Sequence, residues 1–293
     1  MKQFPNLSTN PGWIIILTFF LAFGCTTGSD KSAKLSIDYE KYTLENGLDV
    51  VLHQDSSDPL VAVAILYHVG SCREIPGKTG FAHLFEHILF QESENVPQDE
   101  FFKKIQDVGG TLNGGTSYDY TVYYEVVPKN ALEKVLWMES DRMGFMINTL
   151  TPSAFVNQQN VVLNEKRERV DNQPYGHTSY LINKNIYPEG HPYSWTVIGE
   201  MDDLKNASLE DVKEFYDKFY GPNNATLVIA GDITKEEVKP LVEKYFGEIK
   251  KRQEVVDREP LNIKLDSTIK LYHEDNFAKV PELTMVWPTV NDF

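Results

Sequence analysis

Three polar residues lie at helical spacing within an otherwise apolar segment, residues 80–90. His83, Glu86 and His87 occupy positions i, i+3 and i+4, so a helix would carry all three on one face. Two imidazoles one turn apart can hold a single metal ion, and a carboxylate between them can reach a water molecule on that ion. The spacing therefore predicts a metal centre. The alternative interpretation is a pair of hydrogen-bonded core histidines beside a solvated glutamate.

The order H-x-x-E-H reverses the more common H-E-x-x-H zinc motif and also occurs in zinc peptidases. A zinc ion that keeps one position open for water needs a third protein ligand. A second helix is predicted from Thr151 to about Val170, because an N-cap threonine is followed by a first-turn proline. The residues alone leave four carboxylates as alternatives for the third ligand, namely Glu165, Glu168, Glu139 and Asp141.

Strand and turn signals surround these two helices. Asn46-Gly47 between strand-forming residues predicts a β-hairpin. Residues 61–69 are apolar at both odd and even positions, as in a central strand, and residues 120–127 and 225–233 are rich in strand-forming residues. Amphipathic patterns predict further helices over 130–146 and 238–246.

The first residues differ in composition from the remainder of the chain. An apolar run from Trp13 to Phe23 has the length of a signal-peptide core and ends at Gly24-Cys25, which resembles the lipidation site of bacterial lipoproteins. We therefore predict a signal peptide over residues 1–24, lipidation of Cys25 and a polar tether over 25–38. The alternative is an uncleaved N-terminal anchor helix. Both interpretations place the domain in the bacterial cell envelope, and the lipoprotein interpretation predicts a lipid-anchored protein of the periplasm or outer membrane.

Composition limits the remaining possibilities. The formal net charge of −15 without a basic block excludes nucleic acid as a partner. With Cys25 lipidated, we expect no intramolecular disulfide between it and the only other cysteine, Cys72. We expect one domain over residues 39–250 and a charged linker over 251–262. Residues 263–293 would be the truncated start of a second, similar domain, with strands at 269–273 and 283–287.

These segments together resemble the insulinase-like (pitrilysin, M16) zinc metallopeptidases, and more closely the bacterial two-domain members related to mitochondrial processing peptidase. The resemblance spans roughly residues 39–287. Besides the motif at 83–87, the matching segments are 68–71, 112–113 with 121–124, 141–143, 161–167, and 220–224 with 231–232.

The resemblance assigns roles to individual residues. His83, His87 and Glu165 would hold one zinc ion per chain, which selects Glu165 among the four carboxylates. Glu86 would be the general base that takes a proton from the zinc-bound water and passes it to the leaving amine. Many relatives carry a glutamate seven positions before the third ligand, where this chain has Gln158. An uncharged residue there would weaken zinc binding or slow turnover.

The resemblance also implies an architecture and a partner. The fold would be α+β, a mixed and largely antiparallel sheet with helices packed on one face. A substrate would add to the sheet as a strand and contact Asn113 and Gly114. Relatives pair this domain with a second insulinase-like domain that contributes an arginine and a tyrosine to substrate binding. That domain would be a missing C-terminal half or a separate chain, and we expect the isolated chain to be inactive without it.

We therefore expect a zinc-dependent endopeptidase that hydrolyses peptides or unfolded protein segments. The alternative is a non-catalytic subunit of a two-chain insulinase-like complex that binds polypeptides or serves in assembly.

Overall fold

The sheet begins with the predicted hairpin. Strands β1 (Glu40–Thr43) and β2 (Asp49–Gln54) pair antiparallel, which confirms the turn at Asn46-Gly47. Gly47 adopts a φ of 91°, a conformation that costs glycine little. The Asn46 side chain donates hydrogen bonds of 2.7 Å and 2.8 Å to the carbonyl oxygens of Phe246 and Ile249. The turn is thereby tied to the last helix of the domain.

Four further strands complete a six-stranded sheet in the order β1-β2-β6-β3-β5-β4. They are β3 (Leu60–Tyr67), β4 (Thr111–Thr116), β5 (Thr121–Pro128) and β6 (Ala225–Gly231). Strands β2 and β6 are parallel, and the other neighbouring pairs are antiparallel. The predicted mixed, largely antiparallel α+β fold is therefore confirmed.

The structure is a computed structural model that describes residues 36–256 and 263–288, and every element named here belongs to one unit, residues 38–293. The predicted signal peptide, Cys25 and most of the tether lie outside the described residues. None of the helices in the described ranges is both long enough and apolar enough to cross a membrane.

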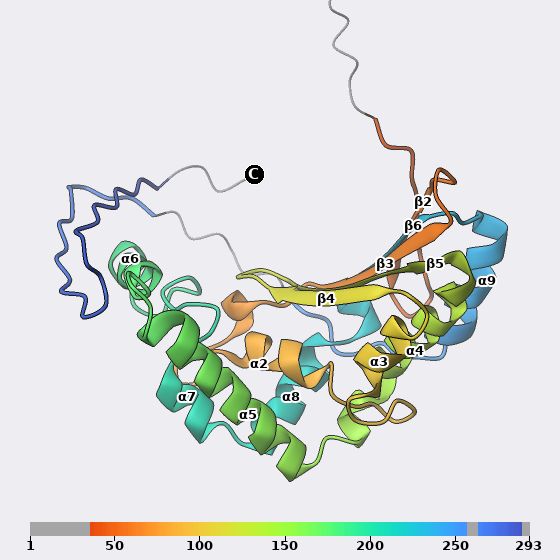
Figure 1. The fold of residues 1–293 in the computed structure, drawn as a ribbon, viewed down its shortest axis with the longest axis horizontal. Coiled ribbons are helices and arrows are strands. Elements are labelled where there is room, and N and C mark those ends of the chain that lie inside the picture. The colour runs from red at the N-terminus through yellow and green to blue at the C-terminus, as the bar shows by residue number, and fades with distance from the viewer. Residues whose placement is uncertain (1–35, 257–262, 289–293) are drawn as a thin grey trace, which may run out of the picture. The chain divides into compact units, whose positions relative to one another are not determined.

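The helices cover the face of the sheet to which the alternate apolar residues point. Along β3 the side chains of Val61, Val63, Ile65 and Tyr67 are fully buried, while the intervening residues are half-buried. Helices α2, α3, α4, α5, α7 and α8 lie on one face of the sheet (Figure 1). Strand β4 forms one edge of the sheet, because it pairs only with β5.

The α-helices are α2 (Phe81–Ile88), α3 (Glu100–Gln106), α4 (Leu132–Phe145), α5 (Pro152–Lys166), α6 (Thr178–Ile186), α7 (Met201–Asn206), α8 (Leu209–Phe219) and α9 (Lys235–Phe246). Short 3₁₀ turns occur at Ser71–Arg73, Lys129–Ala131, Met146–Asn148 and Pro222–Asn224, and α5 continues into one π-helical segment, Arg167–Asp171.

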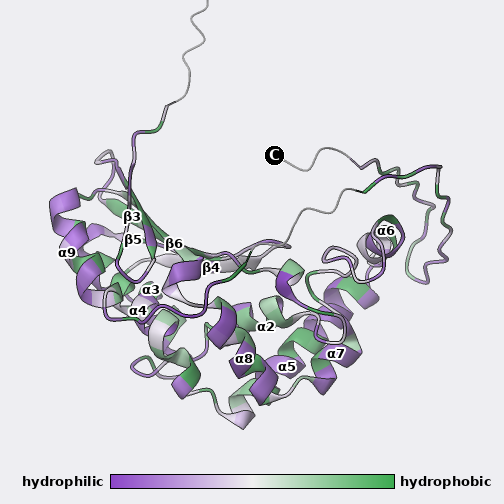
Figure 2. Cartoon of the chain, turned by 180° about the vertical axis from the view of Figure 1, so that it is seen from behind, coloured by the Kyte–Doolittle hydropathy of each residue, from purple (hydrophilic) through white to green (hydrophobic). Residues whose placement is uncertain are grey.

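Local signals explain where several helices begin. Ser208 and Thr234 each form a capping box at the start of α8 and α9. Helix α9 buries Val238, Val242 and Phe246, which lie four residues apart, and its hydrophilic residues lie on the other side (Figure 2).

Residues 263–288 differ from the prediction, because they contain no strand or helix. The predicted strands at 269–273 and 283–287 were therefore wrong. A strand needs a neighbour to bond its backbone, and neither edge of the six-stranded sheet pairs with this segment. The segment instead contacts the chain after α5. The Tyr175 backbone N–H donates to Asp275 Oδ2 over 2.8 Å, and the Tyr175 hydroxyl donates to the Val280 carbonyl over 2.7 Å.

A buried arginine sits between the sheet and helices α3 and α4. The Arg142 guanidinium is fully buried and lies 4.3 Å from the centre of the Tyr123 ring and 4.5 Å from that of the Phe101 ring. It forms ion pairs with Glu139 and, over 3.6 Å, with Glu125. Burial and the neighbouring charge of Glu139 raise the pKa of Glu125 well above its usual range. The guanidinium is thus the positive charge that two buried carboxyl groups share.

We expect Arg142→Met to lower the free energy of unfolding by about 3–5 kcal/mol, because it leaves buried carboxyl groups without their cation. Urea unfolding of the purified protein measures the change. The matched control is Lys103→Met, which breaks the exposed pair with Asp107 and should leave the free energy of unfolding almost unchanged. Equal losses in the two variants would contradict a structural role for the buried cluster.

Candidate metal centre

Helix α2 is held against the sheet so that one polar face stays accessible. Five of its eight residues are buried, namely Phe81, Ala82, Leu84, Phe85 and Ile88. The three that remain partly exposed are His83, Glu86 and His87. The structure therefore places the three motif residues on one face, as their spacing predicts.

The start of α2 is fixed by tight packing and by a buried acid. Gly80 has a φ of 86°, and a Cβ atom there would lie 2.7 Å from the Ile198 carbonyl oxygen, so glycine is required. The two carboxylate oxygens of Glu74 accept hydrogen bonds of 2.9 Å from the backbone N–H groups of Gly80 and Ala82. Acceptor oxygens at this position favour the helix, because they bond N–H groups that have no partner within the helix.

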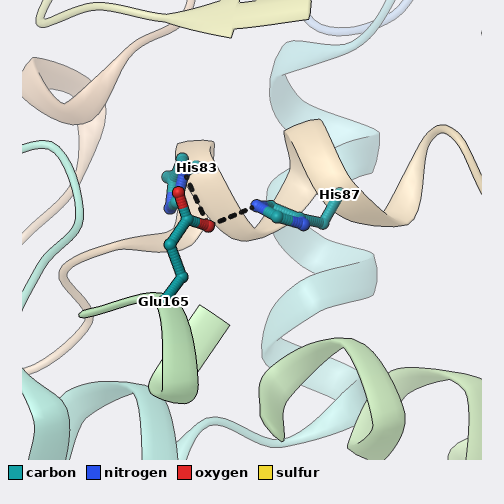
Figure 3. Close-up of side chains that lie close together, drawn as sticks. All are labelled: His83, His87 and Glu165. Atoms are coloured by element: carbon teal, nitrogen blue, oxygen red, sulfur yellow. Dashed lines mark ion pairs between the residues drawn. The ribbon is translucent and has the colours of Figure 1, made fainter. Parts of the chain in front are cut away.

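Glu165 approaches this face from helix α5. The Thr151 hydroxyl accepts a hydrogen bond from the Ala154 backbone N–H and starts the helix, as predicted. Glu165 Oε2 lies 3.0 Å from His87 Nε2 and 3.8 Å from His83 Nε2 (Figure 3). One donor atom from each of the three residues lies within 4.8 Å of the others.

This donor set fits a zinc ion. Zinc binds imidazole nitrogen and carboxylate oxygen at about 2.0–2.2 Å, so three ligand atoms of one ion lie about 3–4 Å apart. Burial, and next the neighbouring His87, lower the pKa of His83. The imidazole of His83 is therefore kept neutral, which is the form that binds metal. Its Nδ1 atom is buried and has no hydrogen-bond partner among the residues that the structure describes.

Two contacts orient the carboxylates of the site. Arg169 Nη1 lies 2.7 Å from Glu165 Oε1, which leaves Oε2 directed at the histidines. The Thr116 hydroxyl donates a hydrogen bond of 2.6 Å to Glu86 Oε2. Thr116 ends strand β4, so the edge of the sheet reaches the polar face of the helix.

The other three candidate carboxylates lie elsewhere. Glu139 pairs with the buried Arg142. Asp141 accepts hydrogen bonds from the Ser93 hydroxyl and from both the backbone and side-chain nitrogens of Asn95. Glu168 is an exposed residue of the π-helical segment. Of the four alternatives, only Glu165 lies beside the two histidines.

The remaining predicted site residues are placed as follows. Gln158 lies on α5 two turns before Glu165 and is 5% exposed. Asn113 and Gly114 lie on the edge strand β4, opposite Tyr124 and Tyr123. The Gly114 backbone N–H donates to Asn113 Oδ1 over 2.8 Å. Cys25 lies outside the described residues.

Sequence reasoning missed Thr116, Arg169 and Glu74. Arg169 follows Glu165 by four residues, and this helical spacing could have identified it. Thr116 lies 30 residues from Glu86, and Glu74 precedes its helix across a turn, so no periodic pattern marks either one.

Comparisons with known proteins find relatives of this chain. Residues 49–192 match the family model of insulinase, peptidase family M16, and residues 206–292 match that of the peptidase M16 inactive domain. The zinc protease PqqE of Helicobacter pylori is 36% identical over 217 residues, which cover 74% of this chain and 48% of that protein. The probable mitochondrial-processing peptidase subunit beta of Schizosaccharomyces pombe is 28% identical over 210 residues, which cover 72% of this chain and 45% of that protein.

Solved structures show the same fold. The crystal structure of a protease from Helicobacter pylori gives a TM-score of 0.73 at 35% identity and covers 78% of this chain and 54% of that chain. The first half of the periplasmic protease PqqL from Escherichia coli gives a TM-score of 0.69 at 23% identity, over 77% of this chain and 49% of that chain. The chain spans about half the length of the curated relatives that it matches.

The buried Glu74 makes the domain's stability depend on pH. Burial raises the pKa of Glu74 from 4.5 to about 8, although the backbone N–H groups of Ala82, Gly80 and Phe81 oppose the shift. The folded state therefore keeps a proton that the unfolded chain releases above pH 4.5. This contribution to stability is complete below pH 4.5 and is lost as the pH rises through about 8.

We expect the difference in free energy of unfolding between the wild type and Glu74→Gln to shrink as the pH rises from 5 to 8, by on the order of 4 kcal/mol at most. Urea unfolding of both metal-free proteins at each pH measures it. A difference that does not change across this range would show that Glu74 has no raised pKa.

Proposed function

We propose a function for this chain from one premise: the chain belongs to the insulinase family of peptidases, M16. We infer that it is the metal-binding half of a zinc-dependent endopeptidase that acts on peptides or unfolded protein segments. The observation that carries this proposal is the convergence of His83, His87 and Glu165 on one point, with Glu86 on the same helical face. His83, His87 and Glu165 would hold one zinc ion per chain.

Bound zinc would supply a Lewis acid that polarises the peptide carbonyl group and eases deprotonation of a water molecule. Glu86 is the general base in this proposal. It takes a proton from the attacking water and gives that proton to the leaving amine. Thr116 donates to one oxygen of Glu86, which leaves the other oxygen available to accept a proton. Arg169 keeps Glu165 directed at the two histidines.

The edge strand β4 is the proposed docking line for the peptide. Ser117 donates a backbone hydrogen bond to Tyr120 across the turn that joins β4 to β5. Hydrogen-bonded and non-hydrogen-bonded residue pairs alternate along antiparallel strands. Thr116 and Gly114 are in non-hydrogen-bonded pairs, so their backbone N–H and C=O groups point away from β5. A peptide added as a seventh strand would meet these groups at Gly114 and the side chain of Asn113.

A second insulinase-like domain is part of the proposal. Because this chain covers about half of its relatives, the groups that stabilise the developing oxyanion would come from a C-terminal half or from a separate chain. The match of residues 206–292 to the M16 inactive domain includes α8, β6 and α9 together with residues 263–288. The domain boundary at 251–262 stays a prediction. Many relatives carry a glutamate at the position of Gln158, so the site of this chain would have one negative charge fewer than theirs.

We also propose that the protein acts in the bacterial cell envelope. The predicted signal peptide supports this location, and PqqL of Escherichia coli, which shares the fold, is a periplasmic protease. Attachment to the membrane through a lipid on Cys25 stays a prediction.

Zinc binding is the first test. We expect wild-type protein to bind one equivalent of zinc and His87→Ala to lose at least about 10-fold in affinity, because one of three ligands is removed. Competition with a fluorescent chelator measures the affinity. The control is His53→Ala, which removes a histidine of strand β2 that contacts the Asp38 carbonyl. If the wild type and both variants bind zinc equally, the proposed site is wrong.

Hydrolysis is the second test. Cleavage of a quenched peptide is measured with stoichiometric zinc, for this chain alone and together with an insulinase-like C-terminal domain from the same genome. We expect Glu86→Gln to keep its zinc and to lose about 10²–10⁴-fold in rate, because the general base is gone. The control Glu168→Gln removes an exposed glutamate of the adjacent helix and should keep the wild-type rate.

The outcomes separate the two candidate functions. Activity that requires the added domain supports a two-part zinc peptidase. Bound zinc without hydrolysis in either mixture favours the alternative, a non-catalytic subunit that binds polypeptides or serves in assembly.

A further inference from the structure

One hydrogen bond links the edge of the sheet to the motif helix. The Thr116 hydroxyl donates to Glu86 Oε2 over 2.6 Å, across 30 residues of sequence. Glu86 lies between the two histidines on the polar face of α2, and Thr116 is the last residue of β4. A hydroxyl has one proton to donate, so it occupies one oxygen of the carboxylate and leaves the other for a second partner. The bond therefore fixes which oxygen of Glu86 is free.

Strand β4 holds Thr116 firmly in this position. A Cβ atom on Gly114 would lie 3.0 Å from the Phe90 ring, so the strand runs close to the segment that follows α2. Thr116 lies opposite Thr121 in the backbone pairing of β4 with β5. A β-branched side chain in a strand has few rotamers. The hydroxyl of Thr116 is thus aimed at α2 by the sheet and does not depend on a flexible loop.

Thr116 also belongs to the open edge of the sheet. Thr116 pairs with Thr121, one residue before the hydrogen-bonded pair Ser117–Tyr120. Its backbone N–H and C=O groups therefore point away from β5. The backbone of this residue therefore faces the line along which an added strand would pair, while its side chain contacts Glu86. Among the described residues, no other side chain donates a hydrogen bond to Glu86.

We propose that Thr116 is a positioning residue for Glu86 and joins the peptide-docking strand to the general base. This inference rests on the proposed function. By holding Oε2, Thr116 keeps Oε1 turned toward the site, so that the same strand that aligns the peptide backbone also sets the direction of proton transfer. A hydrogen bond to an ionised carboxylate is among the stronger side-chain bonds in proteins, which suits it to this task.

The test compares three variants with the wild type in the two-domain hydrolysis assay. Thr116→Val keeps the side-chain shape and removes the hydroxyl, and Thr116→Ser keeps the hydroxyl. We expect Thr116→Val to lower kcat about 10- to 100-fold with KM and zinc affinity unchanged within about 2-fold. Thr116→Ser should restore kcat to within about 3-fold of the wild type. Thr121→Val removes a neighbouring hydroxyl bond that does not reach Glu86 and should keep the wild-type kcat.

A second measurement does not depend on activity. A double-mutant cycle with Thr116→Val and Glu86→Ala, followed by urea unfolding of the metal-free protein, reports whether the two side chains are coupled. Coupling together with a selective loss of kcat supports the inference. Absence of coupling overturns it, and so does a Thr116→Val enzyme as fast as Thr121→Val. If the wild type itself binds zinc but does not hydrolyse peptide with the second domain, the proposed function fails, and the positioning role fails with it.

Discussion

The structure depends on one constraint at helix α2. This helix must bury its apolar residues between the sheet and the other helices, yet it carries two imidazoles and a carboxylate. Buried polar groups are costly unless they have partners. Glu74 and Gly80 fix where the helix begins. Its polar face stays partly exposed and contacts Glu165 and Thr116. A shift of the helix start by one residue would rotate the histidines by about 100° and separate them from Glu165.

The domain contains two clusters of charged and polar side chains, and their surroundings differ. Around Arg142 the charges are fully enclosed and paired with each other, and aromatic rings cover the guanidinium. At the metal centre the donor atoms converge on a point that stays open, with side-chain exposures of 13%, 24% and 15% for His83, His87 and Glu165. The first arrangement is closed to solvent. The second brings three donor atoms within 4.8 Å of one another and leaves them partly exposed.

The open edge of the sheet lies beside this second cluster. An unpaired edge is normally a liability, because it invites association with other chains. Here the Asn113 side chain accepts the outward N–H of Gly114. The edge is thereby partly satisfied without substrate, and a peptide that docks there must compete with an internal hydrogen bond. This arrangement suits a surface that is used for transient pairing with extended chains, as the proposed function requires.

The sequence by itself determined the parts of this protein that depend on short-range spacing. The i, i+3, i+4 pattern placed the motif residues on one helical face, Asn46-Gly47 predicted the hairpin, and Thr151 predicted the start of α5. These features follow from the periods of helix and strand and from local hydrogen bonds. Both depend only on residues that are close together in the sequence. The family resemblance added the α+β fold that the structure confirms.

Only the tertiary structure decided which distant groups meet. Periodicity could not choose among four carboxylates, because the choice depends on how α5 and α4 pack against α2; packing brought Glu165 to the histidines and gave Glu139 to Arg142. The strands expected at 269–273 and 283–287 did not form, since strand-forming residues need a neighbouring backbone that this part of the chain does not provide. The contact between Thr116 and Glu86 also depends on strand pairing. The pairing of β4 with β5 places Thr116 beside α2, and the sequence near Thr116 does not show which strand pairs with which.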